Sequence, residues 1–189
     1  MPLTLDDIRQ LFDAYGGRQY SGEPVTQLQH ALQTAQFAEE AGADDELVTA
    51  CLLHDLGHLL NDQGETPTER GIDDAHQYFA LPFLRGLFGD RVLAAIKLHV
   101  DAKRFLCATR DGYHDALSAD SKRSLVLQGG IYDASSCRTF LAQPFAADAV
   151  QLRLWDDLAK QPDKTTPDLD HFLARVARCR VDPAQTGTA

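Results

Sequence analysis

Long apolar runs and closely spaced cysteines are missing from this chain, and strand-like alternation is nearly absent. No run of apolar residues reaches the length of a membrane span, and the start shows no charged-then-apolar leader. The four cysteines form no CxxC pair; they are Cys51, Cys107, Cys137 and Cys179. We therefore expect a cytoplasmic protein with reduced thiols, in which Cys51 is a buried small hydrophobe.

Basic residues are also few. Lys and Arg number 18 against 28 Asp and Glu, which gives a net charge of −10. Nucleic acids and anionic membranes need basic patches, so this balance argues against both as main partners. A small anionic substrate needs only a few local cations and remains compatible with the charge.

Helical periodicity dominates instead, and 189 residues suffice for one compact all-α domain with a core. We expect a first helix from Thr4, a second capped by Thr26 and ended near Gly42, and a third starting at Asp44 or Asp45. The polar stretch 61–71 is expected to be an exposed loop and a candidate lid. Further helices are expected at roughly 73–87, 90–106, 121–129, 135–142, 145–160 and 168–180.

Histidines are the most informative polar residues. Seven occur, and five of them lie on expected helices in the middle of the chain. One buried histidine is usually a satisfied core residue, because an unpaired polar ring costs on the order of 1–3 kcal/mol. Five together favour a metal site, since imidazole is the commonest metal ligand. His114 and His171 are expected to be structural or exposed.

The sharpest local pattern is Leu52-Leu53-His54-Asp55-Leu56-Gly57-His58. Adjacent side chains diverge by about 100° on a regular helix, so His54 and Asp55 can bind one ion together only near a helix end. Gly57 allows a close approach there, and His58 is expected one turn beyond His54 on the same face. The two oxygens of Asp55 can bridge two ions.

This doublet resembles the His-Asp pair of HD-domain metalloproteins. The segments 20–30, 52–60, 98–104 and 125–130 further resemble HD-domain oxygenases that degrade organophosphonates, over about residues 15–160. The resemblance implies a single HD-domain helical bundle over residues 1–181, with a flexible tail at 182–189. It also implies six metal ligands, with Asp156 preferred to Asp157 as the last; they are His30, His54, Asp55, His76, His99 and Asp156.

In that family a mixed-valent Fe(II)/Fe(III) pair uses O2 to cleave the C–P bond of a 1-hydroxy-2-aminoethylphosphonate or of its trimethylammonium counterpart. The products are glycine or glycine betaine, with phosphate. Iron is implied by the resemblance alone, because four imidazoles and two carboxylates also suit manganese or zinc.

The resemblance also suggests roles for residues around these six ligands, which together are called the cage. Tyr20 would cap the O2-binding iron and Glu23 would bind the substrate's amino group, although a plain surface turn fits the same residues. His58 and Lys103 would contact the phosphonate. A polar stripe could bind its remaining oxygens, with helix capping by Ser121 as the alternative; it comprises Ser121, Ser124 and Gln128.

Two other functions fit an HD domain. A phosphohydrolase would use the same cage on a phosphate ester, and a catalytically silent module would sense a ligand or bind a partner. The sequence leaves open whether the substrate carries a primary amine or a quaternary ammonium, which prefers aromatic neighbours. Aromatic candidates are Tyr20, Tyr78, Phe79, Phe83 and Phe105. The oligomeric state is open as well.

Overall fold

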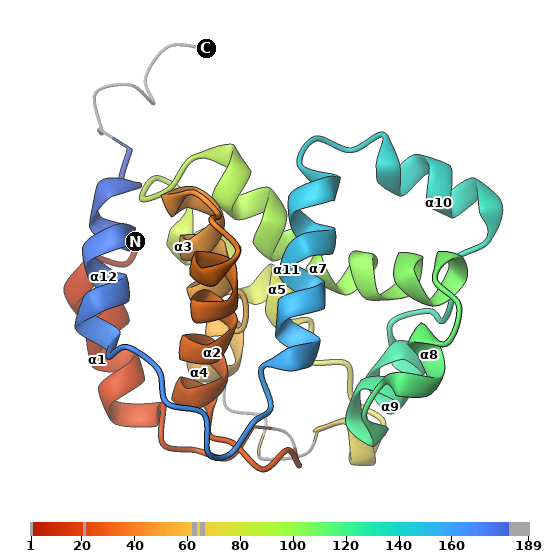
Figure 1. Ribbon diagram of the computed structural model, residues 1–189, viewed down its shortest axis with the longest axis horizontal. Helices are drawn as coiled ribbons and strands as arrows, with labels where there is room; N and C mark the ends of the chain where they lie inside the picture. The colour runs from red at the N-terminus through yellow and green to blue at the C-terminus, as the bar shows by residue number, and fades with distance from the viewer. Residues whose placement is uncertain (1, 21, 62–63, 65–66, 182–189) are drawn as a thin grey trace.

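The computed structural model describes residues 2–20, 22–61, 64 and 67–181, and this part of the chain is built from helices (Figure 1). Its described residues contain isolated β-bridges, such as that of Gln19 with Thr26, and no sheet. The expected all-α class is therefore confirmed. The expected tail at 182–189 lies outside the described residues. Among the described helices, none is both long and apolar enough to cross a membrane.

Polar caps start the first three helices where the sequence predicted them. Helix α1 (Leu5–Tyr15) follows Thr4, and α2 (Gln27–Glu40) follows Thr26; both form reciprocal capping boxes. Helix α3 (Asp45–Leu53) follows Asp44, whose side chain accepts a hydrogen bond from the amide of Leu47. Each cap contributes about 1 kcal/mol.

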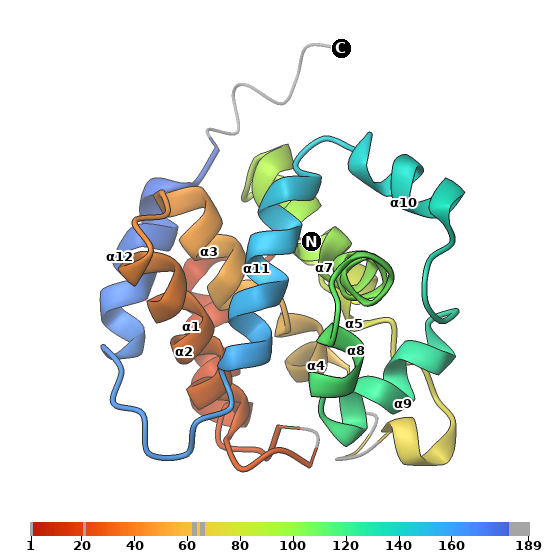
Figure 2. The ribbon, with the colours of Figure 1, turned by 45° about the vertical axis from the view of Figure 1, so that its right-hand side comes forward.

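Two long helices form the middle of the molecule. Helix α11 (Ala146–Leu158) packs against α7 (Asp90–Thr109), and both also pack against α3. In Figure 2, α7 is seen end-on beside α11, with α2, α3 and α12 (Leu169–Arg178) on the other side of α11. The main apolar core lies between these helices and α1. Leu52, Ile96, Leu152 and Phe172 are fully buried there.

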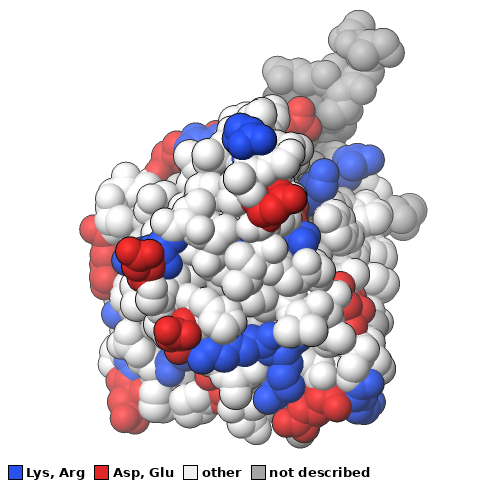
Figure 3. Space-filling model, turned by 90° about the vertical axis from the view of Figure 1, so that its right-hand side faces the viewer, with Lys and Arg blue, Asp and Glu red and all other residues white. Residues whose placement is uncertain are grey.

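A smaller group of helices covers the other side of α7. It comprises α8 (Tyr113–Ala116), α9 (Ala119–Leu127) and α10 (Ala134–Leu141), packed through two smaller apolar clusters. The 3-10 turn η1 (Pro67–Arg70) lies against α9, where Arg123 pairs with Glu69 and Asp120. Figure 3 shows this face, on which both signs of charge are present.

The prediction of a single helix at 73–87 is wrong. Two short helices stand there, α5 (His76–Phe79) and α6 (Leu81–Leu84), with Ala80 between them. Pro82 supplies no N–H for a continuous helix, and Ala75 before α5 has a positive φ of 50°. Helices α4 (Leu56–Leu60) and α8 were not predicted. In the loop expected at 61–71, Pro67 is buried rather than exposed, and residues 62–63 and 65–66 lie outside the described part.

Gly57 permits the close approach of α5 to α4. A Cβ at this position would lie 2.1 Å from the backbone oxygen of His76. We expect Gly57→Ala to lower the free energy of unfolding by about 1–3 kcal/mol or more, because backbone must move. Urea unfolding measures this change. Gly17→Ala is the matched control, since nothing lies within 4 Å of its added Cβ; equal effects in both variants would contradict the steric account.

Candidate metal centre and substrate pocket

The His54-Asp55 doublet lies at a break between two helices. Helix α3 ends at Leu53, and Asp55, with φ −103° and ψ 13°, precedes α4. The break removes the 100° divergence of a regular helix, so both side chains reach one site. It also means that His58 lies on a different helix from His54, so the expectation of one shared helical face is wrong.

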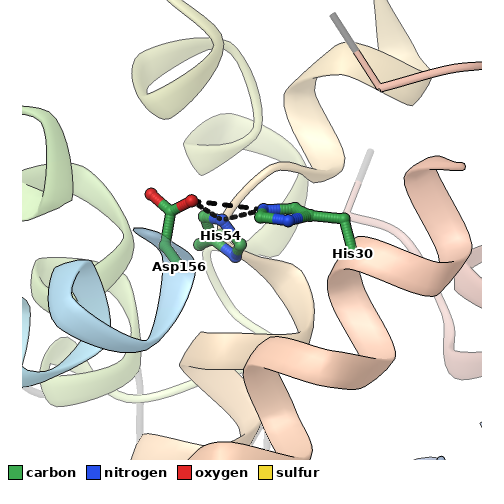
Figure 4. A group of neighbouring side chains, drawn as sticks. All are labelled: His30, His54 and Asp156. Carbon is green, nitrogen blue, oxygen red and sulfur yellow. Dashed lines mark hydrogen bonds and ion pairs between the residues drawn. The ribbon is translucent and has the colours of Figure 1, made fainter. Parts of the chain in front are cut away.

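One group of possible ligands joins three separate segments. His30 comes from α2, His54 from the end of α3 and Asp156 from α11 (Figure 4). The Nε2 atoms of His30 and His54 are 3.2 Å apart, and Asp156 Oδ1 lies 3.3 Å from His30 Nε2. Asp157 instead accepts hydrogen bonds from Arg153 and Tyr113, so the structure brings Asp156 rather than its neighbour to this group.

A second group lies beside the first. His76 of α5 and His99 of α7 have their Nε2 atoms 3.1 Å apart, and Asp55 completes the group. Asp55 faces both groups: its Oδ2 lies 3.3 Å from His54 Nε2, and its Oδ1 lies 3.2 Å from His76 Nε2. Asp55 is therefore placed to bridge two ions with one oxygen each.

The outer nitrogens of the four histidines are occupied. Nδ1 of each ring donates a hydrogen bond: His30 to the carbonyl of Ala159, His54 to that of Cys51, and His99 to that of Ile96, at 2.7–2.8 Å. A carbonyl can only accept, so the proton is on Nδ1 and the Nε2 lone pair is directed inward. His76 has the same arrangement through a carboxylate of Asp74, at 2.8 Å.

These donors fit metal ions. Two neutral Nε2 atoms about 3 Å apart cannot hydrogen-bond each other when both carry lone pairs, and two such pairs occur. Three buried carboxylate oxygens of Asp55 and Asp156 also have no hydrogen-bond partner. Unpaired buried acceptors are costly unless a cation satisfies them. Four imidazoles and two carboxylates suit iron, manganese or zinc.

Without metal, protons take the place of the cations. Burial alone would lower the pKa of His30, but the carboxylates of Asp156 and Asp55, 3.3 and 3.5 Å from its Nε2, raise it to about 9. For His76, burial again lowers the pKa, but the charges of Asp74 and Asp55 raise it to about 10. The pKa of Asp55 is held well below its usual range against burial, chiefly by the charges of His54 and His76. A metal must therefore displace protons to bind.

Two residues that position the cage were not foreseen from the sequence. Asp74 accepts from Nδ1 of both His58 and His76, each at 2.8 Å, and so fixes both rings. Arg153 is buried and holds the outer oxygen of Asp156 at 2.8 Å. The i,i+3 spacing of Arg153 and Asp156 on one helix was a readable signal. Asp74 gave none, because its role depends on the turn before α5.

A pocket opens beside the cage, and most of the expected substrate contacts line it. It has a cavity volume of about 40 Å³. Its lining includes Tyr20, His58, Lys103, Ser121, Ser124 and Gln128. Glu23 is not among the lining residues. Ser118, rather than Ser121, caps α9, which leaves the buried Ser121 hydroxyl at the pocket.

Lys103 is a buried cation at this pocket. Its Nζ donates to Ser124 Oγ at 2.7 Å. Burial, followed by the charge of Arg153, lowers the pKa of Lys103 to about 7, against the opposing effect of Asp156. An anion bound beside it would favour its charged form.

Tyr20 covers the cage from the loop before α2. Its ring stacks on His30, with centroids 3.8 Å apart and an interplanar angle of 12°. Burial and the charges of Asp55 and Asp156 raise its pKa well above 10, so the hydroxyl stays protonated.

The HD-domain profile matches residues 28–126, a span that holds the first five candidate ligands. The chain belongs to the HD-domain family. It is 37% identical over 168 residues to the [1-hydroxy-2-(trimethylamino)ethyl]phosphonate dioxygenase (glycine-betaine-forming) of Leisingera caerulea, covering 89% of this chain and 86% of that one. It is 40% identical over 164 residues to the hydroxymethylphosphonate dioxygenase of Gimesia maris, covering 86% and 82%.

Metal should stabilise the fold, and more so at higher pH. The raised pKa values mean that protonated His30 and His76 stabilise the metal-free protein fully below about pH 6.5 and lose this effect as pH rises through about 9–10. Metal needs neutral imidazoles. We expect anaerobic Fe²⁺ to raise Tm more at about pH 8.5 than at about pH 6.5; an equal or smaller gain at high pH would contradict this account.

Asp74 should matter for one ion more than for the other. Asp74→Ala removes the partner that orients His76, and loss of such a contact lowers metal affinity by about 10–100-fold. Titration calorimetry should show one weakened and one unchanged site. Asp170→Ala, at an exposed carboxylate paired with Arg9, is the control and should keep both affinities. Equal weakening of both sites by Asp74→Ala would contradict the assignment of Asp74 to the site that contains His76.

Proposed function

We propose that this protein is a dioxygenase that uses O2 and two iron ions, in a mixed-valent Fe(II)/Fe(III) state, to cleave the C–P bond of a 1-hydroxyphosphonate. The observation that carries the proposal is Asp55, whose two oxygens each face a different pair of histidines. The dioxygenase names of two relatives, each matched over more than four-fifths of its length, support the oxidative chemistry. For a 2-amino or 2-trimethylamino substrate the products would be glycine or glycine betaine, with phosphate.

Six side chains would hold the ions. His30, His54 and Asp156 would hold one, His76 and His99 the other, and Asp55 would bridge them. When bound, the iron pair would supply coordination sites for the substrate and O2 and would pass electrons from the one to the other. The surrounding protein keeps the four imidazoles in the Nδ1-protonated form through the carbonyls and through Asp74.

The other pocket residues would bind the phosphonate. Lys103 supplies the buried positive charge, and Ser124, already bonded to Lys103, lies beside it. His58 Nδ1 donates to Asp74, so the ring would bind a phosphonate oxygen in its doubly protonated form, by donating from Nε2. A phosphonate has three oxygens to satisfy, and Ser121 and Gln128 lie on the same side of the pocket as Ser124, on or next to α9.

Tyr20 would control access to the cage. In this structure its ring stacks on the candidate ligand His30 and lines the pocket. We propose that substrate binding moves Tyr20 aside. Because a covered cage excludes O2, this order would keep O2 from reacting before the substrate is bound.

Phosphate release should require O2 and both metal sites. His99→Ala should lower the iron content from about two ions per chain to about one and abolish O2-dependent phosphate release. Iron analysis and a phosphate assay with and without O2 measure this. His114→Ala is the control, because the His114 side chain is 44% exposed and belongs to none of the possible ligand groups among the described residues.

The phosphohydrolase alternative makes the opposite prediction. A hydrolase would release phosphate equally well under anaerobic conditions, since water supplies the attacking oxygen. Continued release without O2, or full activity in His99→Ala, would overturn the dioxygenase.

A further inference from the structure

The carboxylate of Glu23 already has a cationic partner in this chain. Glu23 Oε1 lies 2.9 Å from Nζ of Lys160. The Glu23 and Lys160 side chains are only 13% and 15% exposed, so the pair is largely withdrawn from solvent. Removing one partner of a largely buried ion pair is strongly unfavourable, because it leaves the other charge without a counter-charge. Lys160 was not among the residues that the sequence suggested for the site.

The position of Lys160 is fixed by the segment that carries it. The carbonyl of Ala159 accepts from Nδ1 of the candidate ligand His30, at 2.8 Å. On the other side, Gln161 and Gln33 exchange two hydrogen bonds, at 2.8 and 3.0 Å. The backbone of Lys160 is therefore held against α2 on both sides, so the position of this lysine beside the site is fixed by the fold.

The Lys160 ammonium lies behind the pocket wall, next to residues that line it. It lies 3.3 Å from Ser118 Oγ and 3.5 Å from Ser121 Oγ. It also lies 6.0 Å from the centroid of the Tyr20 ring. Tyr20 and Ser121 line the pocket, whereas the Glu23–Lys160 pair lies behind them. The cavity of about 40 Å³ leaves room for roughly three waters at 10–15 Å³ each.

The pocket also offers little to a quaternary ammonium. Such a group prefers a cage of aromatic faces. Among the described lining residues, Tyr20 is the one Phe, Tyr or Trp side chain. Tyr78 and Phe79 are exposed, and Phe105 packs against Phe140 in a separate apolar cluster.

We propose that Lys160 is a specificity-determining residue whose ammonium takes the place of a substrate amine at Glu23, so that the enzyme prefers a 1-hydroxyphosphonate without a cationic substituent. The inference rests on the proposed function and names its substrate class. A cationic substrate must either displace Lys160 from a largely buried pair or bind beside a like charge. Hydroxymethylphosphonate, the smallest member of the class, avoids both penalties.

The reaction of that substrate balances with O2 alone. Hydroxymethylphosphonate dianion and O2 give formate, hydrogen phosphate and one proton. The C–P bond, one C–H bond and the O–O bond break, while one C–O and one P–O bond form, and hydrogen leaves as the proton. The carbon gives up four electrons, which reduce O2.

The test compares three substrates on the iron-loaded enzyme by O2-dependent phosphate release: hydroxymethylphosphonate, 1-hydroxy-2-aminoethylphosphonate and its trimethylammonium counterpart. We expect kcat/KM for the first to exceed both others by about tenfold or more. Lys160→Met removes the charge at similar length and should reduce this preference by about tenfold or more. Anaerobic calorimetry should show the same shift in the Kd of the cationic substrates.

Three controls separate charge from structure. Lys160→Arg keeps the charge and should keep the preference. Lys164→Met removes a lysine that lies over Phe37 and pairs loosely with Glu40, and should change nothing. In a Glu23→Gln background, Lys160→Met should favour the cationic substrates less than it does in the wild type, because it removes a like charge but leaves no carboxylate for the substrate's cation.

The outcomes are distinct. A wild-type preference for either cationic substrate, or an unchanged preference in Lys160→Met, overturns the role of Lys160 and leaves the proposed function standing. Absence of O2-dependent phosphate release from all three substrates overturns the proposed function itself. If Lys160→Met fails to fold, the wild-type preference and the Lys160→Arg result still decide the inference.

Discussion

One carboxylate, that of Asp55, links the two halves of the candidate metal centre, and the local fold is built around it. Helix α3 stops just before the His54-Asp55 doublet, so that the two neighbouring side chains can serve one site. Gly57 lets the backbone of His76 come close enough for its ring to reach Oδ1 of Asp55. Neither arrangement is explained by packing alone, because each gives up regular helix to bring ligands together.

The second constraint is that each ligand must be held in one protonation state. Backbone carbonyls do this for His30, His54 and His99, while Asp74 does it for His76. Such contacts orient the rings before any metal arrives, so little entropy is lost on binding. The carbonyl of Ala159 accepts from His30, and the next residue, Lys160, pairs with Glu23. The proposed metal centre and the proposed basis of substrate choice therefore both depend on one short segment.

The sequence predicted the parts of this structure that depend on local signals. Capping residues such as Thr26 and Asp44 located helix starts, and the resemblance to HD-domain proteins singled out the candidate ligands that the structure brings together. It failed where tertiary contacts decide. The break at Ala80 needs both Pro82 and the turn before α5, and the pairing of Lys160 with Glu23 joins residues 137 positions apart. No periodicity encodes such a contact.

The central claim is that two ions lie on either side of the Asp55 carboxylate. Anomalous diffraction at the iron edge from iron-loaded crystals tests it most directly. The account predicts two peaks about 3.5–4 Å apart, one near His30 and His54 and the other near His76 and His99, with Asp55 between them. A single peak, or two peaks that Asp55 does not bridge, would contradict it.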